Sequence, residues 1–300
     1  MFDYAALSAV AMIAQEGSFE RAAAALGVTP SAVSQRVRAL EERLGAVLIV
    51  RGHPCTATAI GARLCAHADR VRLLESELAG QLPELAGLHA GGAMTIRVAV
   101  NGDSLNTWFP GAAVAFAEET GALLDLVLDD ENVTAQRLRS GDVFAAVTAD
   151  ASPVQGCRTS TLGALRYVAA ASPGFIGRHF TDGVNARTLA HAPVLRFDRK
   201  DVLQARWVRE SLGIALDAPI HWIPSTQGFL DMAMAGLGWG LHPLMLAEPH
   251  LAAGRLVELV PGARIDMPLH WQSSRVGARL LDRLTAAVRT AAWQALVQEG

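Results

Sequence analysis

One sharply two-sided helix is predicted in the stretch GVTPSAVSQRVRALEERLG, residues 27–45, and it constrains the fold more than any other feature. Apolar side chains recur at steps of four, three and four and share one helical face: Val33, Val37, Leu40 and Leu44. Polar side chains recur at steps of three, one and three and share the opposite face: Ser31, Ser34, Gln35 and Arg38. Thr29 suits the N-cap and Pro30 the first helical position.

The polar face of this helix is unusual because its residues near the start are short. A solvated helix usually carries long Glu and Lys side chains there. Short side chains allow the backbone to approach another object closely, and Ser and Gln offer both hydrogen-bond donors and acceptors. The major groove of double-stranded DNA admits a helix of this kind. We therefore predict that this helix reads DNA.

The neighbouring segments predict a winged helix-turn-helix domain over residues 1–58. Two amphipathic helices precede the two-sided helix, the first closed by Gly17 and the second capped by Ser18. A β-prone stretch, AVLIVRGHPCTATAIG, follows it and predicts a hairpin. An arbitrary small helical bundle is the alternative, but a bundle has no need of the polar face.

The charge of the chain gives no global sign of nucleic acid binding. The net charge is −3, and residues 1–58 balance five arginines against five acidic residues. A basic surface must therefore be local. Four side chains can supply it, because Glu41 and Glu42 lie further along the helix: Arg36, Arg38, Arg51 and His53.

Composition restricts the class of protein. A chain of 300 residues with 51% hydrophobic residues has room for two or three folded domains. The three cysteines lack paired spacing, so we expect neither a disulfide framework nor a metal site: Cys55, Cys65 and Cys157. The N-terminus does not read as a signal peptide, and no apolar run is long enough to span a membrane. We expect a cytoplasmic protein without cofactors.

A linker helix and hinge are predicted over residues 59–91. Apolar side chains lie seven apart, with Leu74 between them: Leu64, Val71, Leu78 and Leu85. Such a stripe packs either on the chain's own body or on a second copy. We favour a dimer, because a two-fold reader of DNA needs two recognition helices about one helical turn apart.

Residues 92–300 predict an α/β domain with two lobes. The segments TIRVAV, LLDLVL and VFAAVT alternate with helical patterns, which predicts a largely parallel sheet covered by helices. We expect lobe I at about 92–163 and 268–300, and lobe II at about 164–267. A cleft between such lobes usually binds a small ligand.

Several motifs resemble those of a known family. The segment GSFERAAAALGVTPSAVSQRVRALEERLG resembles the N-terminal signature of LysR-type transcriptional regulators, and AGLGWGLHP and the domain order agree with it. The segments VNGDSLNTWF, RLRSGDVFAAVT, GCRTSTLGALRYVAAASPGF and STQGF resemble the ArgP/LysG-like subgroup, which controls export of basic amino acids and responds to lysine or arginine. The resemblance implies transcription regulation, a periplasmic-binding-protein-like effector domain, and homodimers or homotetramers.

The resemblance and the geometry of the helix together give a predicted set of DNA contacts. Pro30, Ser31, Ser34 and Gln35 are expected at the groove, Arg38 on phosphate, and Arg51 on the backbone or minor groove. Many family members read Ser-Arg-Gln in this helix, whereas this chain reads Ser-Gln-Arg at residues 34–36. The full predicted set is Thr29, Pro30, Ser31, Ser34, Gln35, Arg36, Arg38 and Arg51.

The effector is expected between two helix starts, VAVNGDSLN in lobe I and PSTQG in lobe II. We expect Ser104, Thr148 and Thr226 to hold the ligand's carboxylate. Three acids compete for its ammonium or guanidinium group: Asp103, Glu131 and Asp198. Acids at strand ends are more often solvated or capping residues. The full predicted set is Asn101, Asp103, Ser104, Glu131, Thr148, Asp198, Ser225 and Thr226.

Three other functions compete with this interpretation. The segment GDSLN approximates the G-x-S-x-G elbow of a serine hydrolase, but Asn106 replaces the second glycine and no triad can be completed around Ser104. We therefore do not expect an enzyme. A solute-binding protein would not carry a DNA-reading domain. A regulator of another pathway, with a different small carboxylate as effector, is the remaining alternative.

Overall fold

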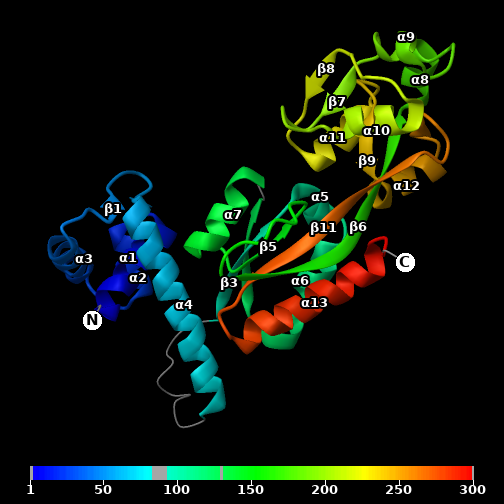
Figure 1. Ribbon diagram of the computed structural model, residues 1–300. Helices are drawn as coiled ribbons and strands as arrows, with labels where there is room; N and C mark the ends of the chain where they lie inside the picture. Colours follow the sequence, from blue (N-terminus) through cyan, green and yellow to red (C-terminus); the bar gives the residue numbers. More distant parts are fainter. Residues whose placement is uncertain (1–2, 83–92, 129–130, 299–300) are drawn as a thin grey trace.

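The computed structural model describes residues 3–82, 93–128 and 131–298. Figure 1 shows a small helical domain at the N-terminus, one long helix, and an α/β domain with two lobes. This order of parts confirms the predicted fold class. No helix within these described ranges is both long and apolar enough to cross a membrane.

The N-terminal domain is a three-helix unit with a short β-hairpin. Its elements are α1 Tyr4–Glu16, α2 Phe19–Ala25, α3 Pro30–Leu44, β1 Ile49–Val50 and β2 Thr56–Ala57. Each helix begins at a side-chain cap: Asp3 for α1, Ser18 for α2 and Thr29 for α3. The two strands pair antiparallel, with Val50 opposite Thr56. The predicted helices and hairpin are thus confirmed.

The apolar face of α3 forms part of the core of this domain. Val33, Val37 and Leu40 are buried against α1 and α2, as their spacing predicts. Leu44, on the same predicted face, is 39% exposed. It lies in the last turn, because the helix ends at Gly45 in the left-handed conformation. The opposite, polar face is left outside the core.

The linker helix α4, Ala59–Gln81, packs against both neighbouring parts of the chain. Its first half lies on α1, where Ala68 is buried in the core of the N-terminal domain. In the predicted stripe, Leu74 is 48% exposed and Leu78 is 50% exposed. Leu73, outside that stripe, is buried in the core of the C-terminal domain. The helix therefore packs on the chain's own body and also leaves apolar surface free.

Some of the linker prediction lies outside the described residues. Leu85 and the end of the predicted linker and hinge, residues 83–91, fall in the range 83–92, which is not described. The division of the chain at residues 58 and 91 stays a prediction.

Lobe I begins with the predicted β-α-β-α-β pattern. Its elements are β3 Thr95–Val100, α5 Gly102–Asn106, α6 Phe109–Thr120, β4 Leu123–Leu128, α7 Glu131–Ser140 and β5 Ala145–Thr148. Strand β3 pairs in parallel with both β4 and β5. The helical pattern between β3 and β4 is two helices, because the backbone turns away at Thr107 and Pro110 lies in the first turn of the next helix.

The sheet is mixed, so the prediction of a largely parallel sheet is wrong. Two long strands, β6 Cys157–Ala171 and β11 Arg264–Ser274, pair antiparallel with each other and run between the lobes. The order of the sheet is β10-β6-β11-β5-β3-β4, and β9 also pairs with β6. Strand β11 lies antiparallel to β5 as well. The chain enters lobe II along one long strand and returns along the other, which fixes their opposite directions.

Lobe II carries short elements between these strands. They are α8 Pro173–His179, α9 Ala186–Leu189, β7 Val194–Arg196, α10 Leu203–Leu212, β8 Ile220–Trp222, α11 Thr226–Met234, β9 Gly240–Pro243, α12 Leu244–Ala252 and β10 Val257–Glu258. The last helix, α13 Arg279–Ala295, returns to lobe I and packs along α6.

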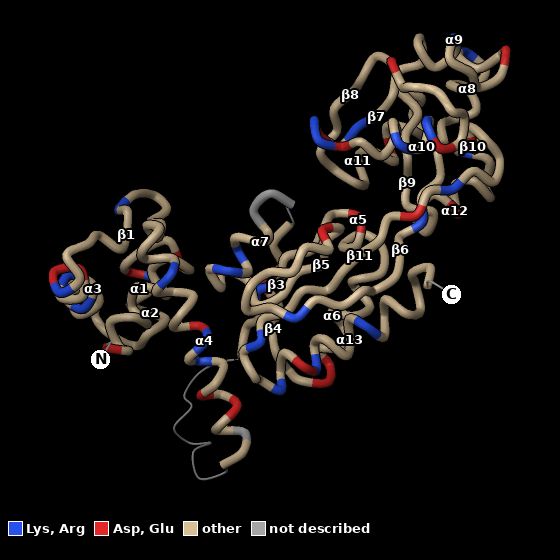
Figure 2. The backbone as a smooth tube through the Cα atoms, viewed as in Figure 1, with Lys and Arg blue, Asp and Glu red and all other residues tan. Residues whose placement is uncertain are grey.

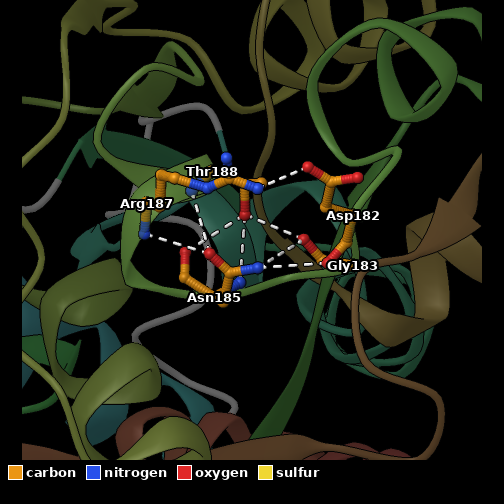
Figure 3. A network of polar contacts seen from close by, with 5 residues as sticks. All are labelled: Asp182, Gly183, Asn185, Arg187 and Thr188. Atoms are coloured by element: carbon orange, nitrogen blue, oxygen red, sulfur yellow. Dashed lines mark hydrogen bonds and ion pairs between the residues drawn. The ribbon is translucent and has the colours of Figure 1, made fainter.

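A polar network fixes the outer end of lobe II (Figure 3). The Asn185 side chain accepts a hydrogen bond from the Thr188 amide at 3.1 Å, and the Thr188 hydroxyl accepts one from the Asn185 amide at 3.0 Å. This capping box starts the four-residue helix α9. Arg187 pairs with Asp182 beside it. These contacts join residues that are close in sequence, and we assign them a structural role.

Candidate DNA interface and effector cleft

The polar face of α3 is exposed to solvent, as a DNA-reading helix requires. Pro30, Ser31, Gln35 and Arg38 are exposed, whereas Ser34 and Arg36 are half-buried. The short side chains near the helix start leave its backbone accessible. The structure therefore places the predicted contact residues on one outward edge, and their roles in binding stay predictions.

Thr29 organises the start of α3. Its hydroxyl accepts a hydrogen bond from the Ala32 amide at 3.2 Å, which satisfies one of the free donors of the first turn. The same oxygen lies 2.9 Å from the Ser31 hydroxyl. Ser31 is thus held in a defined place on the outward edge before any partner is bound.

The wing arginine is anchored on an aromatic ring. The guanidinium carbon of Arg51 lies 4.9 Å from the centre of the Phe19 ring, a cation–π contact between the hairpin and α2. Arg51 remains exposed. The Phe19 ring therefore restricts the direction of the Arg51 guanidinium, which is still exposed and able to reach a phosphate.

One acid of α3 is used inside the domain. Glu41 accepts hydrogen bonds from the amides of Leu48 at 2.7 Å and Ile49 at 3.3 Å, and so ties the helix to the hairpin. Its charge is committed to these donors. Both signs of charge occur on α3 (Figure 2), but its first turn carries no acidic residue.

The candidate effector cleft is centred on Asp103, between the two lobes. Its carboxylate accepts a hydrogen bond from the Tyr167 hydroxyl at 2.6 Å and another from the Thr226 hydroxyl at 2.8 Å. Asp103 belongs to α5 in lobe I, Tyr167 to β6, and Thr226 to the first turn of α11 in lobe II. This carboxylate therefore connects three elements that are distant in sequence.

The environment of Asp103 favours its neutral form. Burial raises the pKa of the Asp103 carboxyl above its ordinary value, the two hydroxyl donors partly oppose this, and the negative charge of Asp201 raises it further. A positive charge placed at this carboxylate would reverse the effect. The site is thus suited to a cationic group.

The lobes also come close together at Gly102. A Cβ atom at this position would lie 3.0 Å from the Thr226 hydroxyl oxygen, so that hydroxyl would have to move by a few tenths of an ångström to admit a larger residue. Asn101 caps α5 by accepting a hydrogen bond from the Ser104 amide at 2.9 Å. The Ser104 hydroxyl is fully buried and has no hydrogen-bond partner among the described residues.

The other predicted effector residues are engaged in local contacts. The buried Thr148 hydroxyl accepts from the Asp150 amide at 3.1 Å, and the exposed Ser225 caps α11 through the Gly228 amide at 3.1 Å. Asp198 is exposed and accepts from the Lys200 amide at 2.8 Å. The side chain of Glu131 lies outside the described residues. The structure therefore joins Asp103 directly to Thr226, with Ser104 in the same short helix as Asp103 and Asn101 at its N-cap.

Two residues of the cleft were missed by the sequence prediction. Tyr167 is 5% exposed, and its pKa is raised well above its ordinary value by burial and then by the charge of Asp103, so the hydroxyl remains a donor. Asp201 holds its own loop through the Phe197 amide at 2.9 Å, and its charge also acts on Asp103 and Tyr167. Tyr167 lies inside the segment GCRTSTLGALRYVAAASPGF, which resembles the ArgP/LysG-like subgroup, but the segment alone gave it no role. Asp201 belongs to none of the quoted segments, and the rarity of tyrosine, with two in the chain, is the other signal for Tyr167.

Comparison with known proteins gives the family. The model for the bacterial regulatory helix-turn-helix protein, lysR family, matches residues 4–62, and the model for the LysR substrate binding domain matches residues 89–293. The chain belongs to the LysR family of bacterial transcriptional regulators. This LysR-family chain carries the two-sided helix in its first matched domain and the two lobes in its second, in the order that the sequence predicts.

Similar proteins cover the whole LysR-family chain. The transcriptional regulator ArgP of Pseudomonas aeruginosa is 44% identical over 99% of this chain and 98% of its own. The lysine export transcriptional regulatory protein LysG of Corynebacterium glutamicum is 43% identical over 97% of this chain and 98% of its own. The solved structure of full-length LysG with bound effector Arg matches with a TM-score of 0.67 and 40% identity, over 99% of this chain and 100% of that one.

Proposed function

We propose that this LysR-family regulator responds to a basic amino acid, lysine or arginine, and controls the gene of an amino acid exporter. The observation that carries the proposal is the Asp103 carboxylate, which lies between the lobes and whose pKa is also raised by the charge of a second acid, Asp201. The similarity to a lysine export regulator and to a LysG structure with bound Arg supports it.

The proposed binding mode uses opposite charges at the two ends of the ligand. The ligand's cationic group takes the place of the Thr226 hydroxyl at Asp103, which frees that hydroxyl for the ligand's carboxylate. The buried Ser104 hydroxyl is a second donor for the carboxylate. Further contacts are proposed from Asn101, Glu131, Thr148, Asp198 and Ser225.

The DNA-binding role is assigned to residues 1–58, the linker to 59–91 and effector binding to 92–300. The outward edge of α3 enters the major groove, and Arg51 reaches the backbone. The proposed contact set is Thr29, Pro30, Ser31, Ser34, Gln35, Arg36, Arg38 and Arg51. A second copy pairs along the exposed stripe of α4, and two such dimers form a tetramer.

Catalysis by Ser104 is not part of this proposal. Its hydroxyl is fully buried and bonded to no base among the described residues, whereas a nucleophile needs a base within hydrogen-bond reach. We infer that the regulator works in the cytoplasm, where its DNA target lies, and that it needs no metal or cofactor.

Calorimetry on the full chain tests the proposal. Arginine and lysine are expected to bind, and citrulline and norleucine, which have similar side chains without the charge, are expected to bind at least about tenfold more weakly, because a buried carboxylate loses its charged partner. Equal binding of the neutral analogues would contradict a basic effector. No binding of arginine or lysine at millimolar concentration, with binding of another small carboxylate, would favour a regulator of a different pathway.

A further inference from the structure

Helix α4 is shared by the two functional parts of the chain. Leu64, Cys65 and Ala68 in its first half pack with the core of the N-terminal domain. In its second half Leu73 is 1% exposed and belongs to the core of the C-terminal domain. A continuous helix packed at both ends transmits a change of orientation from one domain to the other.

Three side chains of α4 form the contact with lobe I: Arg70, Leu73 and Glu77. They lie at steps of three and four and therefore share one helical face. The Arg70 guanidinium occupies the space beside Gly141, and a Cβ atom on residue 141 would collide with it. The exposed Leu74 and Leu78 lie on a different arc of the helix, so a partner on that arc does not displace this contact.

Glu77 supplies the N-terminal cap of the last helix of the effector domain. Its Oε2 accepts a hydrogen bond from the Arg279 amide at 3.0 Å, and its Oε1 lies 3.8 Å from the Arg279 Nε. The N-cap residue of α13 is Ala278, whose side chain has no acceptor. The Arg279 amide, the first of α13, therefore depends on a carboxylate from α4, where the helix dipole also favours negative charge.

The capped helix leads back to the effector cleft through packed elements. Helix α13 packs along α6, and α6 follows α5, which carries Asp103 and Ser104. Asp103 in turn bonds to Thr226 of lobe II. A displacement of α5 by a ligand is therefore passed to α13 through direct contacts, and from α13 to Glu77.

We infer that Glu77 is a positioning residue that couples effector binding to DNA binding, by holding the linker helix to the N-terminus of α13. The inference rests on the proposed function, since it needs a DNA affinity that changes with effector. Leu73 supplies the apolar part of the contact between α4 and lobe I. Glu77 fixes the relative orientation of α4 and α13, because the hydrogen bond between Glu77 and the Arg279 amide forms in one orientation of the two helices.

The test compares three variants of the full chain: E77A, E77Q and the control E75A. Glu75 lies on the same helix, is exposed, and makes no hydrogen bond or ion pair within the described residues. The first measurement is hydrogen exchange of the Arg279 amide without ligand. In E77A exchange is expected to rise about fivefold, as for loss of a helix cap. E75A is expected to match the wild type.

The second measurement is the ratio of DNA dissociation constants with and without arginine. E77A is expected to bring this ratio close to one, E75A to leave it unchanged, and E77Q, which keeps an acceptor for the amide, to lie between wild type and E77A. An Arg279 amide that exchanges equally in E77A and wild type would overturn the inference, because the contact would then be absent in solution.

The two proposals fail in different ways. An arginine-dependent ratio that survives intact in E77A would overturn the coupling role of Glu77 alone. A wild-type chain whose DNA affinity ignores both arginine and lysine would overturn the proposed function, and the coupling role with it.

Discussion

The DNA-reading edge and the effector cleft are built in opposite ways. The edge is held by contacts between neighbours in sequence, such as Thr29 with the Ala32 amide. The cleft is held by Asp103, Tyr167 and Thr226, and the hydrogen bond from Thr226 to Asp103 spans 123 positions. The edge is therefore formed within the N-terminal domain, whereas the cleft forms only where the two lobes meet. Under the proposed function, the ligand binds at this meeting of the lobes.

The largest expected effect comes from breaking the core behind the edge. Leu40 is 2% exposed in the N-terminal domain, so Leu40→Ala is expected to lower the free energy of unfolding of that domain by about 2–5 kcal/mol through cavity formation. Chemical denaturation followed by far-ultraviolet circular dichroism measures the loss. Arginine binding is expected to persist. A parallel loss of arginine binding would show that the two regions are not built independently.

A smaller effect is expected at the edge itself. Gln35 is exposed on α3, and Gln35→Ala is expected to weaken binding by about 1–3 kcal/mol at one base position, because a Gln side chain can bond one base through two atoms. Gel-shift titrations with cognate and scrambled duplexes measure this. The matched variant Arg38→Ala is expected to weaken both duplexes and to reduce the salt dependence. Equal losses on both duplexes in Gln35→Ala would remove its reading role.

The cleft is expected to respond to pH. The pKa of Asp103 is raised, so the carboxylate is lost as pH falls through that raised value, and arginine binding is expected to weaken as pH falls. Calorimetry from about pH 8 down to about pH 4, the ordinary range of an aspartate, measures the trend, with a limiting loss of about 1.4 kcal/mol per pH unit. Asp103→Asn is expected to bind arginine weakly at every pH. A wild-type affinity that stays flat across this range would count against Asp103 as the cation partner.

The smallest expected effect concerns the cap of the reading helix. Thr29→Ala removes the acceptor of the Ala32 amide and is expected to cost about 1 kcal/mol of stability. Thr29→Ser keeps the hydroxyl and serves as the control. Thermal unfolding of the two variants and the wild type measures the difference. Similar midpoints for Thr29→Ala and Thr29→Ser would mean that the hydroxyl does not hold the edge.

The sequence predicts the N-terminal domain well because its determinants are local. Periodicity gives the buried face of α3, and the caps at Ser18 and Thr29 and the hairpin follow from residue type. The mixed sheet was not predicted, because the pairing of β6 with β11 joins residues 96 to 117 positions apart and leaves no short-range signal.

The cleft could be predicted only in part, for the same reason. Asp103 and Thr226 stand at helix starts, so their motifs indicated them. Tyr167 lies within a strand, and its role depends on what the fold brings opposite it. Asp198 and Asp201 belong to one loop, and the local pattern does not distinguish the acid that acts on Asp103 from the acid that only holds a turn.

Within the described ranges, β6 and β11 are the only named strands that run from one lobe into the other. Their pairing shifts register between Leu269 and His270, opposite Gly163, whose φ is +117°. A narrow ribbon with such an irregularity twists more easily than it bends within its own plane, because twisting keeps its ladder bonds. Binding in the cleft would thus rotate lobe II about this ribbon, while its distance from lobe I stayed nearly fixed.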